Sequence, residues 1–285
     1  MVIFSFKEEA EKNPVAPDES FFLQGNDRLC FLIHGLTGTP REMGFLAHRL
    51  HRAGYSAAAP LMKGHNMTLS TLKKIRWQDF YAAMKEKFLE QAARCESVFV
   101  AGLSFGALLG LCLAHEFPRK VKALICLSPT LFFDGWSTPK SRVLLPLIYR
   151  TPLKYNIFFK EESPYGIKNE RLRSRIESYY KKAKLDDYEQ IHLHGYPAIP
   201  VSCMYQNHLL ANYVSSLLGT IRNPALLVQA KDDDVTSPRN SEYIYQRLGS
   251  SDKEICFLED SYHIITADQE REKVAQRVIS FLNKY

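Results

Sequence analysis

The sequence has little that would place the chain in a membrane or a secretory pathway. No run among its 285 residues approaches the roughly 18 consecutive apolar residues that a bilayer span needs, so no membrane span is expected. The first residues, MVIFSFKEEAEKNP, contain neither a basic segment nor a long apolar segment. We therefore expect no secretory signal peptide.

The sequence is also poor in metal-ligand and disulfide patterns. Its six cysteines form no CxxC pair, and Cys30, Cys126 and Cys256 lie in apolar strand-like runs. The pair His192 and His194 has no carboxylate or cysteine partner at ligand spacing, so we expect it to pack within the fold. These features predict buried, reduced thiols, no metal site and a cytoplasmic protein.

The motifs of nucleotide and nucleic-acid recognition are missing as well. The chain has neither a G-x-G-x-x-G nor a G-K-[ST] sequence, which argues against a glycine-rich phosphate loop. Its formal net charge of +6 comes without a zinc-finger, RNP or basic-zipper pattern. We therefore expect no nucleic-acid partner.

The chain does contain a regular alternation of short apolar runs and helical patterns. The apolar runs lie at 29–33, 97–102, 121–128, 224–230 and 253–259. The helical patterns lie at 40–54, 77–94, 240–248 and 270–284. Near-continuous apolar strands are typical of parallel sheets that helices cover on both faces. The alternation predicts an α/β fold with a mostly parallel, doubly wound sheet.

The stretch 136–219 breaks this alternation. It is divided into short pieces by Pro139, Pro146, Pro152, Pro164, Pro197 and Pro200. Helical spacing of apolar residues returns at 170–185 and at 210–221. We expect a helical cap at 136–219, inserted into a core that is formed by 1–135 and 220–285.

A serine stands in the pentapeptide Gly102-Leu103-Ser104-Phe105-Gly106, a G-x-S-x-G pattern. An apolar strand runs into this pattern and a helical segment leaves it, which is the context of a nucleophile elbow. Such a turn exposes Ser104 at the carboxyl end of the sheet and aims the amide of Phe105 at a developing oxyanion. The alternative is a tight turn in which the serine only caps the helix.

A serine nucleophile needs a base, and the base needs an acid that orients it. His263 is the candidate base because it lies in the loop EDSYH between the last predicted strand and the last predicted helix. The alternative is that His263 only caps that helix. The candidate acids are Asp232, Asp233 and Asp234, and their spacing alone does not choose among them.

The loop after the first predicted strand reads HGLTGTPRE. Its glycines allow the backbone to approach a ligand closely. We expect His34 to fix this loop and the N–H group of Leu36 to point at an oxyanion, together with that of Phe105.

These motifs resemble those of the α/β-hydrolase superfamily, and within it the small bacterial carboxylesterases and monoacylglycerol lipases, which are often classed with serine aminopeptidases. HGLTGTP is similar to their oxyanion loop, GLSFGA to their elbow, QAKDDDV to their acid loop and SYHIITAD to their histidine loop. KGHN and RWQDF are similar to two further segments. One departure is visible, because the family's GHG is Gly64-His65-Asn66 here.

The resemblance runs from the strand at 29–33 to the end of the chain and leaves out the cap. It implies an α/β-hydrolase fold with Ser104, Asp233 and His263 as a catalytic triad, and with Leu36 and Phe105 as oxyanion amides. It also implies hydrolysis of carboxylic esters through an acyl-enzyme intermediate, with no metal or organic cofactor. A thioesterase, a peptidase or a non-catalytic ligand-binding protein on the same fold are the alternatives.

Substrate choice is expected to depend on the cap. Its apolar segments at 131–136, 143–149 and 155–159 either line an acyl pocket or form the cap's own core. From Trp136 to Gly195 the chain has 12 Lys and Arg against 7 Asp and Glu. This basic excess favours a weak contact with an anionic lipid surface. The sequence does not specify the oligomeric state.

Overall fold

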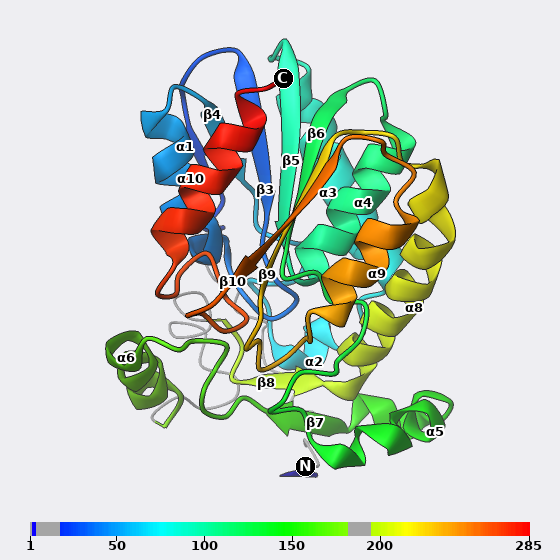
Figure 1. The fold of residues 1–285 in the computed structure, drawn as a ribbon. Helices are drawn as coiled ribbons and strands as arrows, with labels where there is room; N and C mark the ends of the chain where they lie inside the picture. The colour runs from blue at the N-terminus through cyan, green and yellow to red at the C-terminus, as the bar shows by residue number, and fades with distance from the viewer. Residues whose placement is uncertain (1, 4–17, 182–194) are drawn as a thin grey trace.

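A computed structural model of the chain describes residues 2–3, 18–181 and 195–285 (Figure 1). Its centre is a seven-stranded sheet in the order β10-β9-β6-β5-β3-β4-β2. Neighbouring strands are parallel, except that β2 runs antiparallel to β4. The strands span Phe21–Leu23 (β2), Arg28–Ile33 (β3), Ser56–Ala59 (β4), Ser97–Leu103 (β5), Val121–Leu127 (β6), Ala225–Ala230 (β9) and Lys253–Leu258 (β10).

Helices cover both faces of this sheet, which confirms the predicted doubly wound architecture (Figure 1). One face carries α1 (Gly44–Arg52) and α10 (Arg271–Leu282). The other carries α3 (Trp77–Ala92), α4 (Phe105–Glu116), α8 (Val201–Leu217) and α9 (Arg239–Arg247). Shorter turns are η1 (Pro40–Met43), α2 (Leu69–Leu72) and η4 (Leu218–Thr220). Within the described ranges, no helix has the length and apolar character that crossing a membrane requires.

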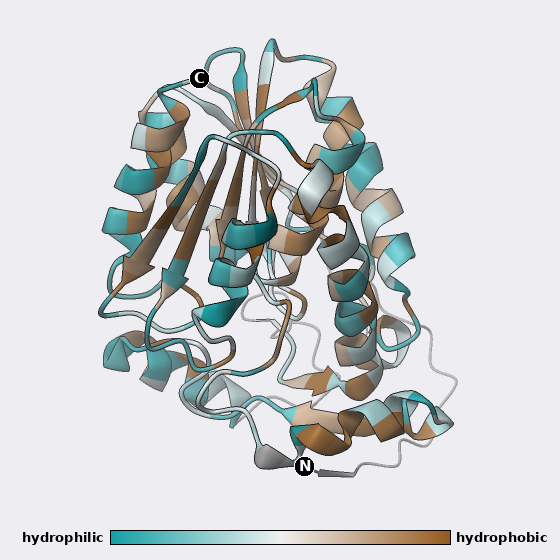
Figure 2. Ribbon diagram, turned by 45° about the vertical axis from the view of Figure 1, so that its right-hand side comes forward, coloured by the Kyte–Doolittle hydropathy of each residue, from teal (hydrophilic) through white to brown (hydrophobic). Residues whose placement is uncertain are grey.

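Alternate residues of the central strands face the two helix layers. In β3, Leu29, Phe31 and Ile33 pack with α3 and α4, whereas Cys30 and Leu32 pack with α1 and α10. Because both faces are covered, the central strands are apolar along most of their length. Figure 2 shows this as brown strands between helices that carry teal on their outer sides.

The cysteines contribute to this core as small apolar side chains. All six are free thiols, and Cys30 and Cys126 are buried as expected. Cys256, which we also expected to be buried, is only partly covered. Burial raises the pKa of Cys126 to about 12, so its thiol stays protonated at neutral pH.

A second, smaller layer lies below the carboxyl ends of the parallel strands (Figure 1). It contains the antiparallel sheet β1-β7-β8 (Val2–Ile3, Ile157–Lys160, Ala198–Pro200), α5 (Leu145–Tyr149), α6 (Glu170–Tyr180), η2 (Lys140–Leu144) and η3 (Pro152–Tyr155). Almost all of this layer comes from the predicted cap. Strands β7 and β8 were not predicted. The helix expected at 170–185 is seen as α6 up to Tyr180, and 182–185 lie outside the described residues. Residues 182–194, with His192 and His194, lie outside the described residues.

α8 connects the two layers. In its first turns, Val201 and Met204 pack against α5. In its later turns, Leu210, Ala211 and Val214 belong to the same apolar cluster as the buried side chains of α3 and α4. The last part of the predicted cap therefore packs on the core sheet's helix layer. The boundaries of the inserted helical cap at 136–219 stay a prediction.

The position of α8 makes its apolar side chains part of the global fold. Leu210 is fully buried, so Leu210→Ala should lower the free energy of unfolding by about 2–5 kcal/mol, because it leaves a cavity. Leu147→Ala removes a side chain that is 68% exposed and should change stability by less than about 0.5 kcal/mol. Urea unfolding followed by circular dichroism measures both. An unchanged midpoint for Leu210→Ala would show that α8 does not stabilise the core.

Candidate active site

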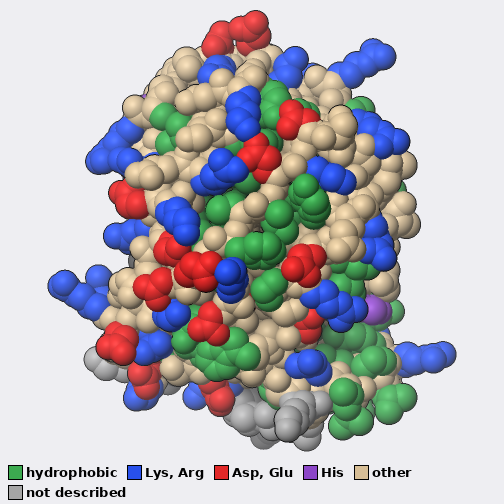
Figure 3. Space-filling view, in the orientation of Figure 1, with side chains coloured by type: hydrophobic (Ala, Val, Ile, Leu, Met, Phe, Trp, Pro, Cys, Tyr) green, Lys and Arg blue, Asp and Glu red, His purple; other side chains and the backbone are tan. Residues whose placement is uncertain are grey.

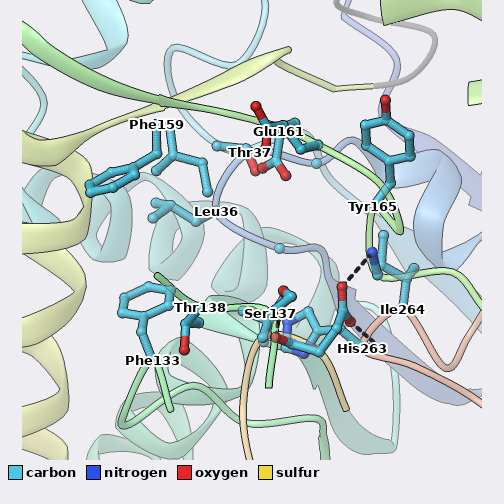
Figure 4. Close-up of a pocket in the computed structure, with 18 of the residues that line it drawn as sticks. Leu36, Thr37, Phe133, Ser137, Thr138, Phe159, Glu161, Tyr165, His263 and Ile264 are labelled. Carbon is cyan, nitrogen blue, oxygen red and sulfur yellow. Dashed lines mark hydrogen bonds between the residues drawn. The ribbon is translucent and has the colours of Figure 1, made fainter. Parts of the chain in front are cut away.

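A cavity of about 290 Å³ lies between the carboxyl ends of the strands and the second layer. Ser104 and His263 line its floor, and residues of β7 and α8 line its far wall. Figure 4 shows this cavity with His263 at one side and Phe133 and Phe159 at the other. The site therefore lies at the sheet edge where open α/β sheets generally bind ligands.

Ser104 occupies a strained turn between β5 and α4. Its backbone angles are φ 58° and ψ −118°, a region that costs a residue with a side chain roughly 1–3 kcal/mol. The neighbouring glycines make the turn possible. A Cβ atom on Gly102 would lie 2.2 Å from the carbonyl oxygen of Gly106, and one on Gly106 would lie 2.3 Å from that of Ile33. Both glycines of the G-x-S-x-G pattern are therefore sterically required.

The structure brings three of the candidate residues into one chain of hydrogen bonds. The Oγ atom of Ser104 lies 2.9 Å from Nε2 of His263. The Nδ1 atom of His263 lies 2.9 Å from Oδ2 of Asp233. Asp233 is held in turn by the amides of Val235 and Thr236, at 2.8 and 2.7 Å. This arrangement orients the imidazole with Nε2 toward the serine.

The three adjacent aspartates have different environments, which spacing alone did not reveal. Asp232 is at the surface, where it pairs with Lys168 at 3.5 Å. Asp234 is buried, and its carboxylate accepts the amides of Gly166 at 3.0 Å and His263 at 3.2 Å. Of the three aspartates, only Asp233 reaches the imidazole of His263 with its side chain. Asp234 instead fixes the backbone on which that imidazole stands.

The electrostatics of the site follow from burial. Burial disfavours the charged imidazole, but the carboxylates of Asp233, and after it of Asp234 and Glu42, outweigh burial, so the pKa of His263 lies above its ordinary value. Burial raises the pKa of Asp234 to about 6. The imidazolium form of His263 is therefore stabilised by a carboxylate that hydrogen bonds hold in place.

The loop after β3 is fixed by two histidines, one of them expected. His34 donates from Nδ1 to the Gly35 carbonyl at 2.9 Å, and its Nε2 accepts the amide of Met62 at 3.0 Å. His65 donates from Nε2 to the Leu36 carbonyl at 2.6 Å. His65 comes from the Gly64-His65-Asn66 segment, so that segment keeps a supporting contact despite its departure from the family pattern.

Glu42 provides a further support that the sequence did not indicate. Its carboxylate accepts the amide of Gly35 at 3.1 Å, and burial raises its pKa to about 7. The loop lies directly beside the nucleophile, because a Cβ atom on Gly35 would be 3.7 Å from Cβ of Ser104. Leu36 lines the cavity, and its carbonyl accepts the hydrogen bond from His65. Phe105, the first residue of α4, has an N–H group without an intrahelical partner.

The cavity has an apolar end and a polar end. The apolar end is lined by Phe133, Leu145, Phe159, Ile199 and Met204. Phe133, Leu145 and Phe159 come from the apolar segments at 131–136, 143–149 and 155–159, one from each segment. The polar side chains that line the cavity include Glu42, Glu161, Tyr165, Tyr180 and Asp234. Figure 4 shows Glu161 and Tyr165 away from Phe133 and Phe159. Burial raises the pKa of Glu161 to about 7.

Thr130 is another residue that sequence reasoning missed. Its hydroxyl oxygen lies 2.7 Å from Oγ of Ser104. Thr130 follows the carboxyl end of β6, which is the neighbour of β5 in the sheet. The position could have been found from the rule that adjacent parallel strands end at the same edge. Across 2–3, 18–181 and 195–285, no three His, Cys, Asp or Glu side chains are grouped so as to hold a metal ion.

Comparison with known proteins places this site in a family context. Residues 24–270 match the model of the family described as serine aminopeptidase, S33. The chain is 27% identical over 277 residues to a thermostable monoacylglycerol lipase of Bacillus sp. (strain H-257). This alignment covers 97% of this chain and 99% of the relative. It is 25% identical over 274 residues to a carboxylesterase of Bacillus subtilis (strain 168), covering 95% and 98%.

Solved structures agree with the fold. The structure described as LipS and LipT, two metagenome-derived lipolytic enzymes, superposes with a TM-score of 0.78 at 27% identity, covering 95% of this chain and 100% of that one. A monoacylglycerol lipase from Paleococcus ferrophilus superposes with a TM-score of 0.74 at 18% identity, covering 93% and 98%. The predicted α/β-hydrolase fold is thereby confirmed.

The elbow geometry makes a prediction about stability that is independent of activity. Gly106→Ala should lower the free energy of unfolding by at least about 2 kcal/mol, because its Cβ would meet the backbone of β3. Gly44→Ala is the matched control, since Gly44 has helical angles and open space around its Cβ position. That control should stabilise the fold by about 0.4–1 kcal/mol. Chemical denaturation of both variants tests the difference, and equal stabilities would contradict the elbow geometry.

Proposed function

The chain belongs to the serine aminopeptidase S33 family, and on that premise we propose that it is a carboxylic ester hydrolase that works through an acyl-enzyme intermediate. The observation that carries the proposal is the chain of hydrogen bonds from Ser104 through His263 to Asp233. It lies at the floor of a cavity with one apolar end, which suits an acyl chain. The two Bacillus relatives, a monoacylglycerol lipase and a carboxylesterase, support an ester as the substrate.

In the proposed mechanism, Oγ of Ser104 attacks the ester carbonyl carbon while Nε2 of His263 takes its proton. The carboxylate of Asp233 stabilises the imidazolium that forms. The amides of Leu36 and Phe105 donate to the oxyanion of the tetrahedral intermediate. His263 then protonates the leaving alcohol, and water releases the acyl group by the same sequence of steps.

The triad acts on the acyl group and does not by itself select the leaving group. Acyl transfer from a thioester or an amide would use the same three side chains, so a thioesterase or a peptidase is the alternative function. A ligand-binding protein without turnover is a further alternative. Purified protein assayed against p-nitrophenyl esters of increasing chain length, an acyl-CoA and an amide separates these functions. Absence of turnover, with no labelling of Ser104 by a fluorophosphonate, would overturn the enzyme proposal.

Asp233 and Asp234 provide the test of the proposed triad. Asp233→Asn should lower kcat by about a thousandfold or more, because the imidazole loses its orienting carboxylate. Asp234→Asn should lower it by less than about tenfold, since among the described residues its carboxylate hydrogen-bonds only to backbone amides. Steady-state hydrolysis of p-nitrophenyl butyrate measures both, with circular dichroism as the check on folding. A major loss at Asp234 alone would contradict the assignment of Asp233.

We further propose that the outer face of the cap makes weak contact with an anionic lipid surface. Val143, Leu144, Leu147, Leu153 and Tyr155, here called the cap patch, are exposed by 74, 52, 68, 56 and 39%. Figure 3 shows hydrophobic side chains gathered at the lower right of the molecule, where α5 lies in Figure 1. Apolar side chains gathered in this way are unusual on a protein surface that faces only water.

The charge around the cap patch points to the kind of surface it contacts. From Gly135 to Lys160 the sequence has no Asp or Glu, while it has Lys140, Arg142, Arg150, Lys154 and Lys160. Basic side chains beside exposed apolar ones suit a lipid surface with negative headgroups. The cap patch is close to the apolar end of the cavity. Leu145, which lies between Leu144 and Leu147 of the patch in the sequence, lines that end.

The double variant Val143→Glu and Leu147→Glu should reduce co-sedimentation with phosphatidylglycerol vesicles by about tenfold or more, because each change places a carboxylate in the patch. Hydrolysis of a short water-soluble ester should be unchanged. Phe22→Glu is the control, since Phe22 is 42% exposed on β2. Unaltered vesicle binding by the double variant would contradict the proposal. The proposal would also be contradicted if the protein formed a dimer in lipid-free buffer and the double variant abolished that dimer, because the cap patch would then be an interface between two copies.

A further inference from the structure

Among the described residues, the side chain of the nucleophile has two hydrogen-bonding neighbours, and one of them does not belong to the triad. Oγ of Ser104 lies 2.9 Å from Nε2 of His263 and 2.7 Å from the hydroxyl oxygen of Thr130. The Thr130 side chain is buried, with 1% of its surface exposed. Bulk water therefore does not reach its hydroxyl group, and a buried hydroxyl needs a hydrogen-bond partner within the protein.

The direction of this hydrogen bond follows from the acceptors available to each proton. The only other partner of the Thr130 hydroxyl in the described residues is the Ser128 carbonyl, at 3.5 Å. That distance lies beyond the usual range of an O–H···O hydrogen bond, whereas 2.7 Å is at its centre. Thr130 therefore donates to Ser104, and Ser104 donates to His263.

The surroundings of Thr130 hold its hydroxyl in this direction. The Thr130 carbonyl accepts Nδ2 of Asn207 at 3.0 Å, and Asn207 is buried on α8. The preceding residues restrict the backbone, since Ser128 has φ 43° and Pro129 has a ring that fixes φ. Threonine is itself branched at Cβ and has few side-chain rotamers. The hydroxyl is therefore placed beside Oγ before any substrate binds.

We propose that Thr130 is a further catalytic residue, whose hydroxyl donates to Oγ of Ser104 and assists release of the acyl group from the enzyme. The inference rests on the proposed ester hydrolysis. In the acyl-enzyme, Oγ is an ester oxygen and a weak acceptor. In the free enzyme it is a hydroxyl oxygen and a stronger one. A fixed donor therefore stabilises the free enzyme more than the acyl-enzyme, and stabilises Oγ as negative charge develops on it.

The step that Thr130 assists balances without any other reactant than water. The water oxygen bonds to the acyl carbon, and its proton goes to Nε2 of His263. The bond between the acyl carbon and Oγ then breaks, its electron pair stays on Oγ, and His263 returns the proton to that atom. Thr130 keeps its own proton throughout and strengthens its hydrogen bond as Oγ leaves.

The test separates acylation from deacylation. Thr130→Val keeps the shape of the side chain and removes the donor, so steady-state kcat on p-nitrophenyl esters should fall about tenfold. An initial burst of p-nitrophenolate should appear, because the acyl-enzyme now accumulates. The rate of fluorophosphonate labelling of Ser104 should stay within threefold of wild type. Thr130→Ser retains a hydroxyl and should restore kcat to within threefold.

Thr266→Val is the matched control. Thr266 is equally buried at 1% exposure, and no described residue hydrogen-bonds its hydroxyl, so this variant should retain wild-type kcat and show no burst. The proposal is overturned if Thr130→Val has a kcat within twofold of wild type. It is also overturned if labelling slows as much as kcat falls, or if Thr130→Ser is as impaired as Thr130→Val. Failure of the ester-hydrolase proposal would appear differently, as full turnover by Ser104→Ala or none by wild type.

Discussion

The strained backbone of Ser104 is the constraint on which the site depends. A serine at φ 58° and ψ −118° is held there only because the elements on both sides of it are fixed. β5 precedes it and pairs with β3 and β6, while α4 follows it and is buried from Phe105 to Ala114. The unusual all-round burial of this helix is therefore part of the site. It anchors the turn that exposes the serine.

The same geometry explains why so many carboxyl groups surround one imidazole. Asp233 accepts hydrogen bonds from the amides of Val235 and Thr236 and from Nε2 of Gln229, the last at 2.7 Å, and these donors fix its carboxylate. Asp234 and Glu42 each accept backbone amides, but burial raises the pKa of both. Their shared function in the structure is to hold main-chain segments, those of His263 and Gly35. Only Asp233 directs its carboxylate at the imidazole, which is why the acid loop tolerates three adjacent aspartates.

Sequence reasoning predicted the parts of this molecule that local patterns specify. The apolar runs of β3, β5, β6 and β9 were found, because strands buried on both faces need mostly apolar residues. β10 is an edge strand and only partly covered, but it also carries a recognisable apolar run. β4 was missed, since its sequence SAAA carries no strong strand preference. Likewise, G-x-S-x-G located the elbow through the steric need for its glycines. Glu42, His65 and Thr130 were missed because they reach the site through tertiary contacts that no local spacing encodes.

The stretch 136–219 shows where such reasoning ends. Its prolines indicated short elements, which holds for η2, α5, η3, β7 and β8 but not for α8, which has 17 residues. Nor did they indicate that α8 would leave this layer to pack with α3 and α4. The path of α8 has a chemical consequence, because the helix that buries Val214 in the core also carries Asn207, which holds the carbonyl of Thr130. Met204, one turn earlier, lines the apolar end of the cavity. One helix therefore links the stability of the core, the shape of the acyl pocket and the surroundings of the nucleophile.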